Sequence, residues 1–489
     1  MRIKKLIENQ QFQLILVVFL GLILRIYGVL SFPVTFDEAH NILLSKVDDT
    51  NLIIRVAAEA YPPLFFLIMH LWEFISDNII FLRALSLAIG VLTIFSIAFV
   101  GGKLFNKKVG LISAYLFAIS PSQIYYSSIA RMYSMAILES VFILYFFFKF
   151  LDKKKVLIPL GLFLLLGLYT HYYFTIFLLV LNIYMFLKKK FLKNWLLLNL
   201  IITILYIPVI SLMLSTQRVF AVPANSILKL PIFLIISVIP WEFIQTLSIF
   251  RYNNLDSTSF YAIVLAFIAL LFIFIAFKFL TKIKKLGTLI FLYILAPFII
   301  LTISFFIFRI SNLRSFILFS PIFFIISSLV LSKISKKKSV FILLSFSLIT
   351  FLFMYNYNLH YLGDNEELRS AYSNFKQEDV VLYNDVILFL PTKILNTPGI
   401  HLLMSPGYLE GTAYDVLGIQ LSSYSSIPKT NKLWYVRQET NWPPYEIFAD
   451  ELESKLDEDL LEKKRIPYYK FQLIEYETDK SVKASSKLI

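Results

Sequence analysis

The stretch Phe12–Phe32, FQLILVVFLGLILRIYGVLSF, is an apolar run of the length that crosses a lipid bilayer as one helix. It is followed by Pro33 and then by Phe36-Asp37-Glu38-Ala39-His40, in which two adjacent carboxylates stand beside an imidazole. The run is longer than the core of a signal peptide, and it lacks a small-residue cleavage site before Pro33. We therefore predict a retained first membrane span that leads into a polar outer segment.

Most of the chain shares the apolar composition of this first run. Of its 489 residues, 58% are hydrophobic and 16% are charged, and the mean hydropathy is +0.73. Soluble globular domains are far less apolar than this. Apolar runs recur as far as Tyr357, which predicts an all-α polytopic membrane bundle of roughly 11 to 13 spans. The absence of cysteine excludes disulfides, thiol nucleophiles and cysteine metal sites.

The net charge of +14 comes largely from short lysine clusters at the ends of the apolar runs. Because these clusters form no single patch or stripe, they do not indicate a nucleic-acid partner. The positive-inside rule places them, and the N-terminus, in the cytoplasm, so that the spans between them must cross in pairs. The predicted spans are residues 12–32, 78–102, 109–122, 132–150, 156–171, 172–187, 195–214, 260–278, 286–308, 315–332 and 339–357.

Two apolar stretches do not fit as simple spans. Residues 231–250 must contain an even number of crossings, which leaves a broken, re-entrant or interfacial element, or a tight pair of spans, as the alternatives. Pro62–Ser76 is short for a span and would invert every later lysine cluster if it crossed. We predict that Pro62–Ser76 is an amphipathic helix on the outer surface.

The composition becomes polar after about residue 360, which predicts two domains. Residues 1–360 form the membrane domain, with an outer loop at 33–77, and residues 361–489 form a small extracytoplasmic α/β domain. The predicted strands and helix of this second domain are Asp379–Tyr383, Leu433–Arg437, Tyr468–Glu477 and the helix Tyr445–Lys464. The predicted location is the plasma or inner membrane, with the C-terminal domain outside the cytoplasm.

The polar residues that could take part in a reaction all fall on the side of the membrane that this topology places outside. Besides Asp37 and Glu38, they are Tyr61, Arg83, Arg131, Tyr133 and His171. A set of carboxylate, guanidinium, imidazole and phenol groups at one membrane face suits a reaction on an anionic, lipid-anchored substrate. Structural roles are the alternatives: the carboxylates can cap a helix dipole, arginines can extend to lipid headgroups, and tyrosines can form an interfacial belt.

These residues also carry a family resemblance. The order DEAHN, YPPLFF, ARMYS, THYYF and then Arg314-Ser315-Phe316 resembles GT-C glycosyltransferases of the dolichyl-phosphate-mannose protein mannosyltransferase kind. The bacterial lipid A aminoarabinose transferase belongs to the same broad group. The resemblance covers roughly residues 10 to 330. It departs from the family at Tyr61, where members often have histidine before the two prolines, and at Ser315, where they have tyrosine.

The resemblance implies transfer of a sugar from a polyprenyl-phosphate donor in the membrane to an extracytoplasmic acceptor, which could be a protein, a glycolipid or a wall polymer. Transfer would invert the anomeric centre, with Asp37 as general base. Glu38 would raise the proton affinity of Asp37 or share a cation with it. Arg314, Arg131 and Arg309 are candidates for binding the leaving phosphate, because a guanidinium gives a phosphate two hydrogen bonds.

No cofactor is required by these motifs, and the chain has no HExxH pair and no phosphate-binding glycine loop. If a divalent metal takes part, Asp37, Glu38 and His40 are the candidate ligands. Two other classes of function stay open. A transporter or flippase of a lipid-linked sugar would share the spans, but repeated halves and broken spans near the midplane are expected of it. The second class is a membrane scaffold that acts through its outer domain.

Overall fold

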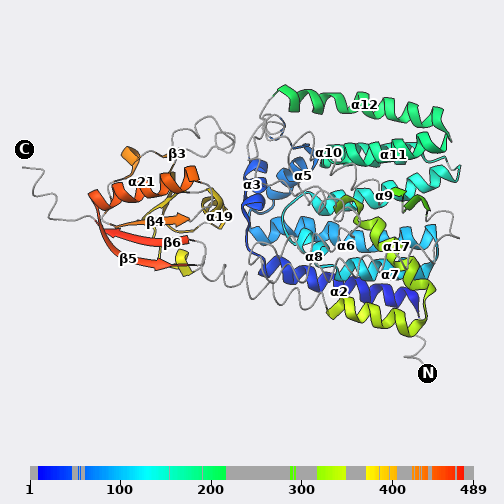
Figure 1. Ribbon diagram of the computed structural model, residues 1–489, viewed down its shortest axis with the longest axis horizontal. Helices are drawn as coiled ribbons and strands as arrows, with labels where there is room; N and C mark the ends of the chain where they lie inside the picture. Colours follow the sequence, from blue (N-terminus) through cyan, green and yellow to red (C-terminus); the bar gives the residue numbers. More distant parts are fainter. Residues whose placement is uncertain are drawn as a thin grey trace, which may run out of the picture. The chain divides into compact units, whose positions relative to one another are not determined.

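In a computed structural model, the chain forms two compact units (Figure 1). The first consists of Met1–Ser31 with Val56–Tyr357, and the second of Phe32–Arg55 with Asn358–Ile489. The residues whose structure is described are 9–46, 53, 56, 61–153, 155–189, 191–215, 287–289, 291–292, 317–348, 370–384, 386–395, 397–404, 421–422, 424–428, 430, 432–438, 443–468 and 471–477.

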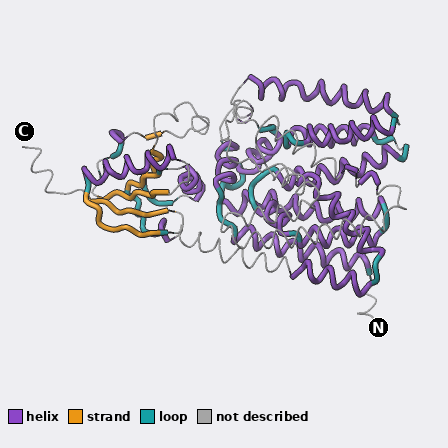
Figure 2. The backbone as a smooth tube through the Cα atoms, viewed as in Figure 1, coloured by secondary structure: helices purple, strands orange, loops and turns teal. Residues whose placement is uncertain are grey.

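The first unit is a bundle of apolar helices (Figures 1 and 2). Its named helices are α2 Gln10–Ser31, α5 Leu64–Glu73, α6 Ile79–Leu104, α7 Lys107–Ile119, α8 Pro121–Ser128, α9 Tyr133–Leu151, α10 Leu157–Thr170, α11 Phe174–Lys188, α12 Leu192–Ser215 and α17 Ser320–Lys333. A further helical stretch covers residues 336–348. Within the described part of the chain, α2, α6, α9 and α12 are long and apolar enough to cross a membrane.

The described helices lie close to the segments predicted from hydropathy. Six of the predicted spans overlap α2, α6, α7, α9, α12 and α17, and the hairpin predicted at 156–187 is formed by α10 and α11. At Pro62–Ser76 there is a helix of 10 residues, α5, which is too short to span a bilayer. The predictions for 231–250 and 260–278 lie outside the described residues, and so does most of 286–308.

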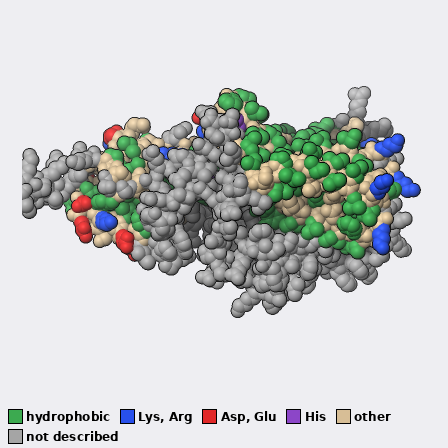
Figure 3. Space-filling model, turned by 90° about the horizontal axis from the view of Figure 1, so that it is seen from above, with side chains coloured by type: hydrophobic (Ala, Val, Ile, Leu, Met, Phe, Trp, Pro, Cys, Tyr) green, Lys and Arg blue, Asp and Glu red, His purple; other side chains and the backbone are tan. Residues whose placement is uncertain are grey.

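The helical unit is apolar outside and carries its polar side chains inside. Figure 3 shows hydrophobic side chains over much of its described surface, and Phe19 and Leu200 are more than half exposed. By contrast, the Ser113 and Ser328 hydroxyls meet at 2.7 Å in the interior, where they join α7 to α17. Lipid favours this pattern, because it solvates apolar groups and leaves polar groups to find partners within the bundle.

Within the described part of the helical unit, basic side chains gather at one end. Lys and Arg side chains lie together at that end in Figure 3. The Lys108 ammonium at the start of α7 donates to the carbonyl oxygen of Ser332 in the last turn of α17 at 3.1 Å. This bond joins the start of α7 to the end of α17, two helix ends that each carry lysines. The orientation of these ends across a membrane remains a prediction.

Helices α6 and α7 approach each other closely at a pair of glycines. A Cβ atom on Gly101 would lie 3.0 Å from the Cα of Gly110, and one on Gly110 would collide with the carbonyl oxygen of Ala98. Only glycine leaves room for such backbone contact, which is a common device in membrane bundles.

The second unit contains a six-stranded sheet of order β3-β2-β1-β4-β6-β5. Strands β3, β2, β1 and β4 are parallel, whereas β6 pairs antiparallel with both β4 and β5. Its elements are α3 Phe36–Ser45, β1 Val380–Tyr383, α19 Val386–Leu395, β2 Ile400–Met404, β3 Leu421–Ser422, η5 Tyr424–Ser426, β4 Lys432–Gln438, α21 Pro443–Asp459, β5 Leu461–Pro467 and β6 Phe471–Glu477.

The two faces of this sheet have different covers. Val380 and Leu382 of β1 join a core with Leu452 and Leu456 of α21. Tyr383 packs edge-on against Phe389 of α19 on the other face, at 5.6 Å between ring centroids. Side chains of a strand alternate between the faces, so one apolar strand serves both layers.

One secondary-structure prediction is wrong. The helix predicted to continue to Lys464 ends at Asp459, and residues 461–467 form β5 instead. Strand β5 lies at the edge of the sheet and most of its residues are exposed. Charged residues on an exposed edge strand discourage pairing with other chains, which explains why this strand has the composition of a polar helix.

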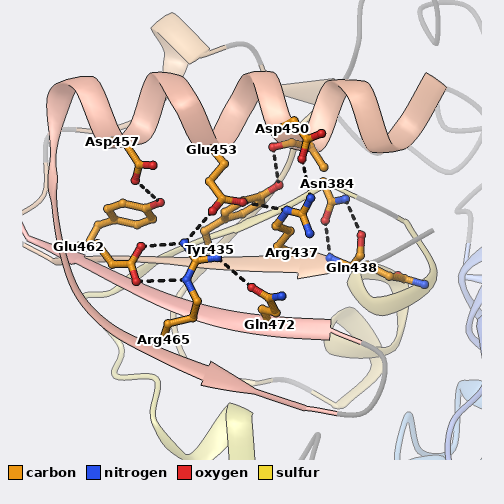
Figure 4. A network of polar contacts seen from close by, with 12 residues as sticks. Asn384, Tyr435, Arg437, Gln438, Asp450, Glu453, Asp457, Glu462, Arg465 and Gln472 are labelled. Atoms are coloured by element: carbon orange, nitrogen blue, oxygen red, sulfur yellow. Dashed lines mark hydrogen bonds and ion pairs between the residues drawn. The ribbon is translucent and has the colours of Figure 1, made fainter. Parts of the chain in front are cut away.

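Helix α21 is tied to the sheet by a network of ion pairs (Figure 4). The Arg437 guanidinium lies 2.6 Å from Asp450 and 2.8 Å from Glu453, and that of Arg465 lies 2.6 Å from Glu453 and 2.7 Å from Glu462. Arg437, Asp450, Glu453 and Arg465 also line an open pocket of about 610 Å³ between α21 and the sheet. Because the network balances opposite charges from helix and strands, we interpret it as the support of α21.

Candidate active site

The arginine, tyrosine and histidine residues predicted to be functional come together in the helical unit. Arg131 stands two residues before Tyr133, the first residue of α9, and His171 caps the C-terminal end of α10. All three side chains are buried. Tyr61 precedes α5, and Arg83 lies in the second turn of α6.

The rings of this cluster form a connected series. The Arg131 guanidinium carbon lies 5.1 Å from the ring centroid of Tyr133, and that ring lies 5.9 Å from the ring of His171. His171 in turn stacks on Tyr172 at 4.8 Å. Tyr61 also lies near Tyr172. We name Tyr61, Arg131, Tyr133, His171 and Tyr172 the aromatic–arginine cluster.

The backbone around the cluster is held by several hydrogen bonds. The Ser86 hydroxyl of α6 donates to the carbonyl oxygen of Arg131 at 3.3 Å. One turn earlier on the same helix, Arg83 donates to the carbonyl oxygen of Val29 in α2 at 2.9 Å. Arg83 therefore links α6 to α2 in this structure. The backbone amide of Tyr173 donates to Nδ1 of His171 at 3.2 Å, which fixes the imidazole beside the turn.

Two buried charged residues of the helical unit were missed by the sequence analysis. Glu139 in α9 accepts a hydrogen bond at 2.7 Å from the hydroxyl of Thr170, the residue before His171. Arg25 in α2 is completely buried and donates to the carbonyl oxygens of Gly21 and Ala118 at 3.0 Å. A single charged residue inside an apolar run is the signal that could have identified both, because such residues are costly in a membrane and rarely lack a role.

The acidic pair belongs to the second unit, on the short helix α3. Thr35 is the N-cap residue of α3, and its hydroxyl accepts a hydrogen bond from the backbone amide of Glu38 at 3.3 Å. The spacing of Thr35 and Glu38 is that of a capping box, and carboxylates in a first turn interact favourably with the helix dipole. Glu38 is fully buried, whereas Asp37 is partly exposed. Asp37 is therefore the more accessible of the two carboxylates.

The remaining predicted site residues are two arginines and a possible metal ligand. Arg309 and Arg314 lie outside the described residues. His40 is buried on α3, with its ring centroid 6.1 Å from that of Phe36. Within the described ranges, no three His, Asp or Glu side chains are grouped so that they could hold a metal ion. The roles predicted for the individual site residues remain predictions.

Comparison with known proteins supports the resemblance seen in the motifs. Residues 60–213 match the sequence model of a family described as dolichyl-phosphate-mannose-protein mannosyltransferase. The matched range includes the whole aromatic–arginine cluster, and it covers less than half of the chain. No curated protein matches the chain in sequence.

Solved structures show the fold. The apo crystal structure of ArnT from Cupriavidus metallidurans has a TM-score of 0.56 at 9% identity, over 94% of this chain and 97% of that one. The structure of the same protein bound to undecaprenyl phosphate has a TM-score of 0.54 at 10% identity, with the same coverage. The predicted fold class, a GT-C-like helical membrane bundle with a small C-terminal sheet domain, is confirmed. The chain is a multi-pass membrane protein.

Proposed function

We propose that this chain is a membrane glycosyltransferase that moves a sugar from a polyprenyl-phosphate donor to an acceptor outside the cytoplasm. The observation that carries the proposal is the aromatic–arginine cluster, which lies wholly inside the range matched by the mannosyltransferase family. Fold likeness to a protein crystallised with undecaprenyl phosphate supports the choice of donor.

The cluster has the chemistry that such a donor needs. Arg131 precedes α9, whose N-terminus has no side-chain cap, so the dipole of this 19-residue helix adds to the positive charge of the guanidinium. A lipid phosphate that leaves during transfer gains negative charge, and fixed positive groups in a water-poor site stabilise it strongly. The surrounding tyrosine rings supply apolar faces with hydroxyl groups at their edges, which suits contacts with a sugar or a prenyl chain.

In the proposed reaction, Asp37 removes the proton from the acceptor hydroxyl or amine as that group attacks the anomeric carbon. The bond between this carbon and the phosphate oxygen breaks in the same displacement, which inverts the anomeric centre. The oxygen leaves as polyprenyl phosphate, whose charge Arg131 neutralises. Glu38 supports Asp37 by completing the first turn of α3.

The test is release of polyprenyl phosphate by purified full-length protein. The donors offered are dolichyl-phosphate mannose and undecaprenyl-phosphate aminoarabinose, with an extract of the cell envelope as acceptor. Asp37→Asn should lower turnover by about 10²–10⁴-fold, because a carboxamide cannot accept the proton. Asp77→Asn is the matched control, because it removes an exposed carboxylate just before α6.

The same assay separates the proposal from transport. A flippase would move the labelled lipid across the bilayer of a vesicle and release no polyprenyl phosphate. Transport without release, or full turnover by Asp37→Asn, would contradict the assignment.

A further inference from the structure

Helix α19 of the second unit is covered on both of its sides. One side faces the sheet, where Phe389 packs against Tyr383 of β1 and Thr392 interacts with the same tyrosine. At about 100° per residue, Leu390, Pro391 and Ile394 fall on the opposite side of the helix. Leu390 is nevertheless 0% exposed and Ile394 is 6% exposed. Something other than the sheet must therefore pack against this second side.

Besides strands β1 and β2 of the sheet, helix α19 lies close to α3, the helix that carries the acidic pair. We infer that α3 covers the side of α19 that faces away from the sheet. These two helices are more than 300 residues apart in the sequence, yet they belong to the same compact unit. Ala39, Ile42 and Leu44 of α3 are all 0% exposed. Because apolar side chains are buried on both helices, we infer that they pack against each other.

Helix α3 needs such a partner. It has only 10 residues, and an isolated helix shorter than about 12 residues is marginal in water. Its capping by Thr35 fixes where the helix begins but contributes only about 1 kcal/mol. The direction in which Asp37 points must therefore be determined by the packing of α3, and α19 provides part of that packing.

We propose that α19 holds α3 in place, so that the C-terminal domain positions the acidic pair for catalysis. Leu390 and Ile394 are positioning residues that act through α3. This inference rests on the proposed glycosyl transfer for its functional part, whereas its structural part can be tested without any activity.

The structural test is amide hydrogen exchange of the full-length protein in detergent. Leu390→Ala should raise the exchange rate over residues 36–45 about tenfold, because it removes packing from the side of α19 away from the sheet. The matched control is Leu456→Ala, which empties a similar volume in the core between α21 and the sheet. The control should raise exchange in α21 and leave residues 36–45 unchanged. Unchanged exchange over 36–45 in Leu390→Ala, or an equal rise in both variants, would overturn the proposal.

The functional test uses the donor assay described above. Leu390→Ala should lower kcat about tenfold and leave the KM for the donor unchanged, because the aromatic–arginine cluster is not altered. Leu390→Met should restore most of kcat, since methionine nearly conserves the volume. A loss of kcat that Leu456→Ala reproduces would indicate general destabilisation and would refute a positioning role.

The two failures can be told apart. If the wild-type protein releases no polyprenyl phosphate while the exchange result is as expected, the glycosyltransferase proposal fails and the support of α3 by α19 stands. Should Leu390→Ala not insert into the membrane, Ile394→Val removes a single methylene from the same side of α19 and gives the same comparison.

Discussion

Arg25 of the helical unit and Arg465 of the sheet unit show how differently the two units accommodate charge. Arg25 is completely buried, and its guanidinium donates to carbonyl oxygens of α2 and of α7. Arg465 lies near the surface and bonds to the carboxylates of Glu453 and Glu462. Water solvates charged groups at the surface of the sheet unit. Lipid cannot do this in the helical unit, so hydrogen-bond partners for its charged groups must come from the protein. We expect substitutions to cost more in the helical unit.

The largest stability effect is expected at Arg25. Arg25→Met keeps much of the length of the side chain but leaves the carbonyl oxygen of Ala118 without its buried donor. An unsatisfied buried carbonyl costs about 1–3 kcal/mol, so we expect a loss of about 2 kcal/mol in the free energy of unfolding. Thermal unfolding of the purified protein in detergent measures it. Leu24→Met on the same helix is the control, and equal losses in the two variants would argue against the role assigned to the guanidinium.

A smaller effect is expected at Thr170. Thr170→Val has nearly the same shape but removes the hydroxyl that donates to Glu139 at 2.7 Å. The expected loss is about 1 kcal/mol, the usual value of a buried hydrogen bond. Thr170→Ser keeps the hydroxyl and should recover most of that loss in the same thermal measurement. If valine and serine behave alike, the bond between α9 and α10 does not contribute to stability.

A still smaller effect is expected at Arg465. Arg465→Ala breaks two ion pairs, but exposed pairs contribute less than about 1 kcal/mol and are screened by salt. We expect a small loss of stability that disappears at high salt. Chemical denaturation of the full-length protein, followed by amide hydrogen exchange over β4, β5 and β6, reports on this unit. A large loss that does not depend on salt would contradict the comparison.

The smallest effect concerns pH. The hydrogen bond from Arg465 lowers the pKa of Glu462 from its ordinary value of 4.5. A carboxylate with a lowered pKa in the folded state contributes stability above its unfolded pKa, and this contribution is lost as the pH falls through the folded pKa. The protection of the β5 amides, which is the observed exchange rate compared with the intrinsic rate at the same pH, should therefore fall below about pH 4.5. Glu462→Gln should show a weaker fall in protection, and an identical pH dependence in both proteins would exclude this carboxylate as the cause.

Hydropathy and the lysine clusters predicted most of the described helices, because lipid imposes one simple rule on long segments. The same rule hid Arg25 and Glu139, each of which stands inside an apolar run and finds its partner on another helix. The sequence does not show that the carbonyl group of Ala118 lies beside the guanidinium of Arg25, because the two residues are 93 positions apart.

The C-terminal domain was less predictable. The strands β1, β4 and β6 follow apolar alternation and lie close to the predicted segments. Helix α19 was missed, because VILFLPTKIL is a short apolar run with Pro391 in its interior and proline disfavours helix. Of the candidate site, sequence located the cluster residues at the correct helix ends, but it placed α3 with the membrane domain and not with the C-terminal domain's α19.

The glycine contact between α6 and α7 has a mechanical consequence. Backbones that touch at Gly101 and Gly110 have no flexible side chains between them to take up a displacement. Sliding one helix along the other would force peptide groups into collision, so we expect this hairpin to move as a rigid rod. Any widening of the bundle to admit a long prenyl tail must then occur at other helix contacts, where side chains separate the backbones and can change rotamer.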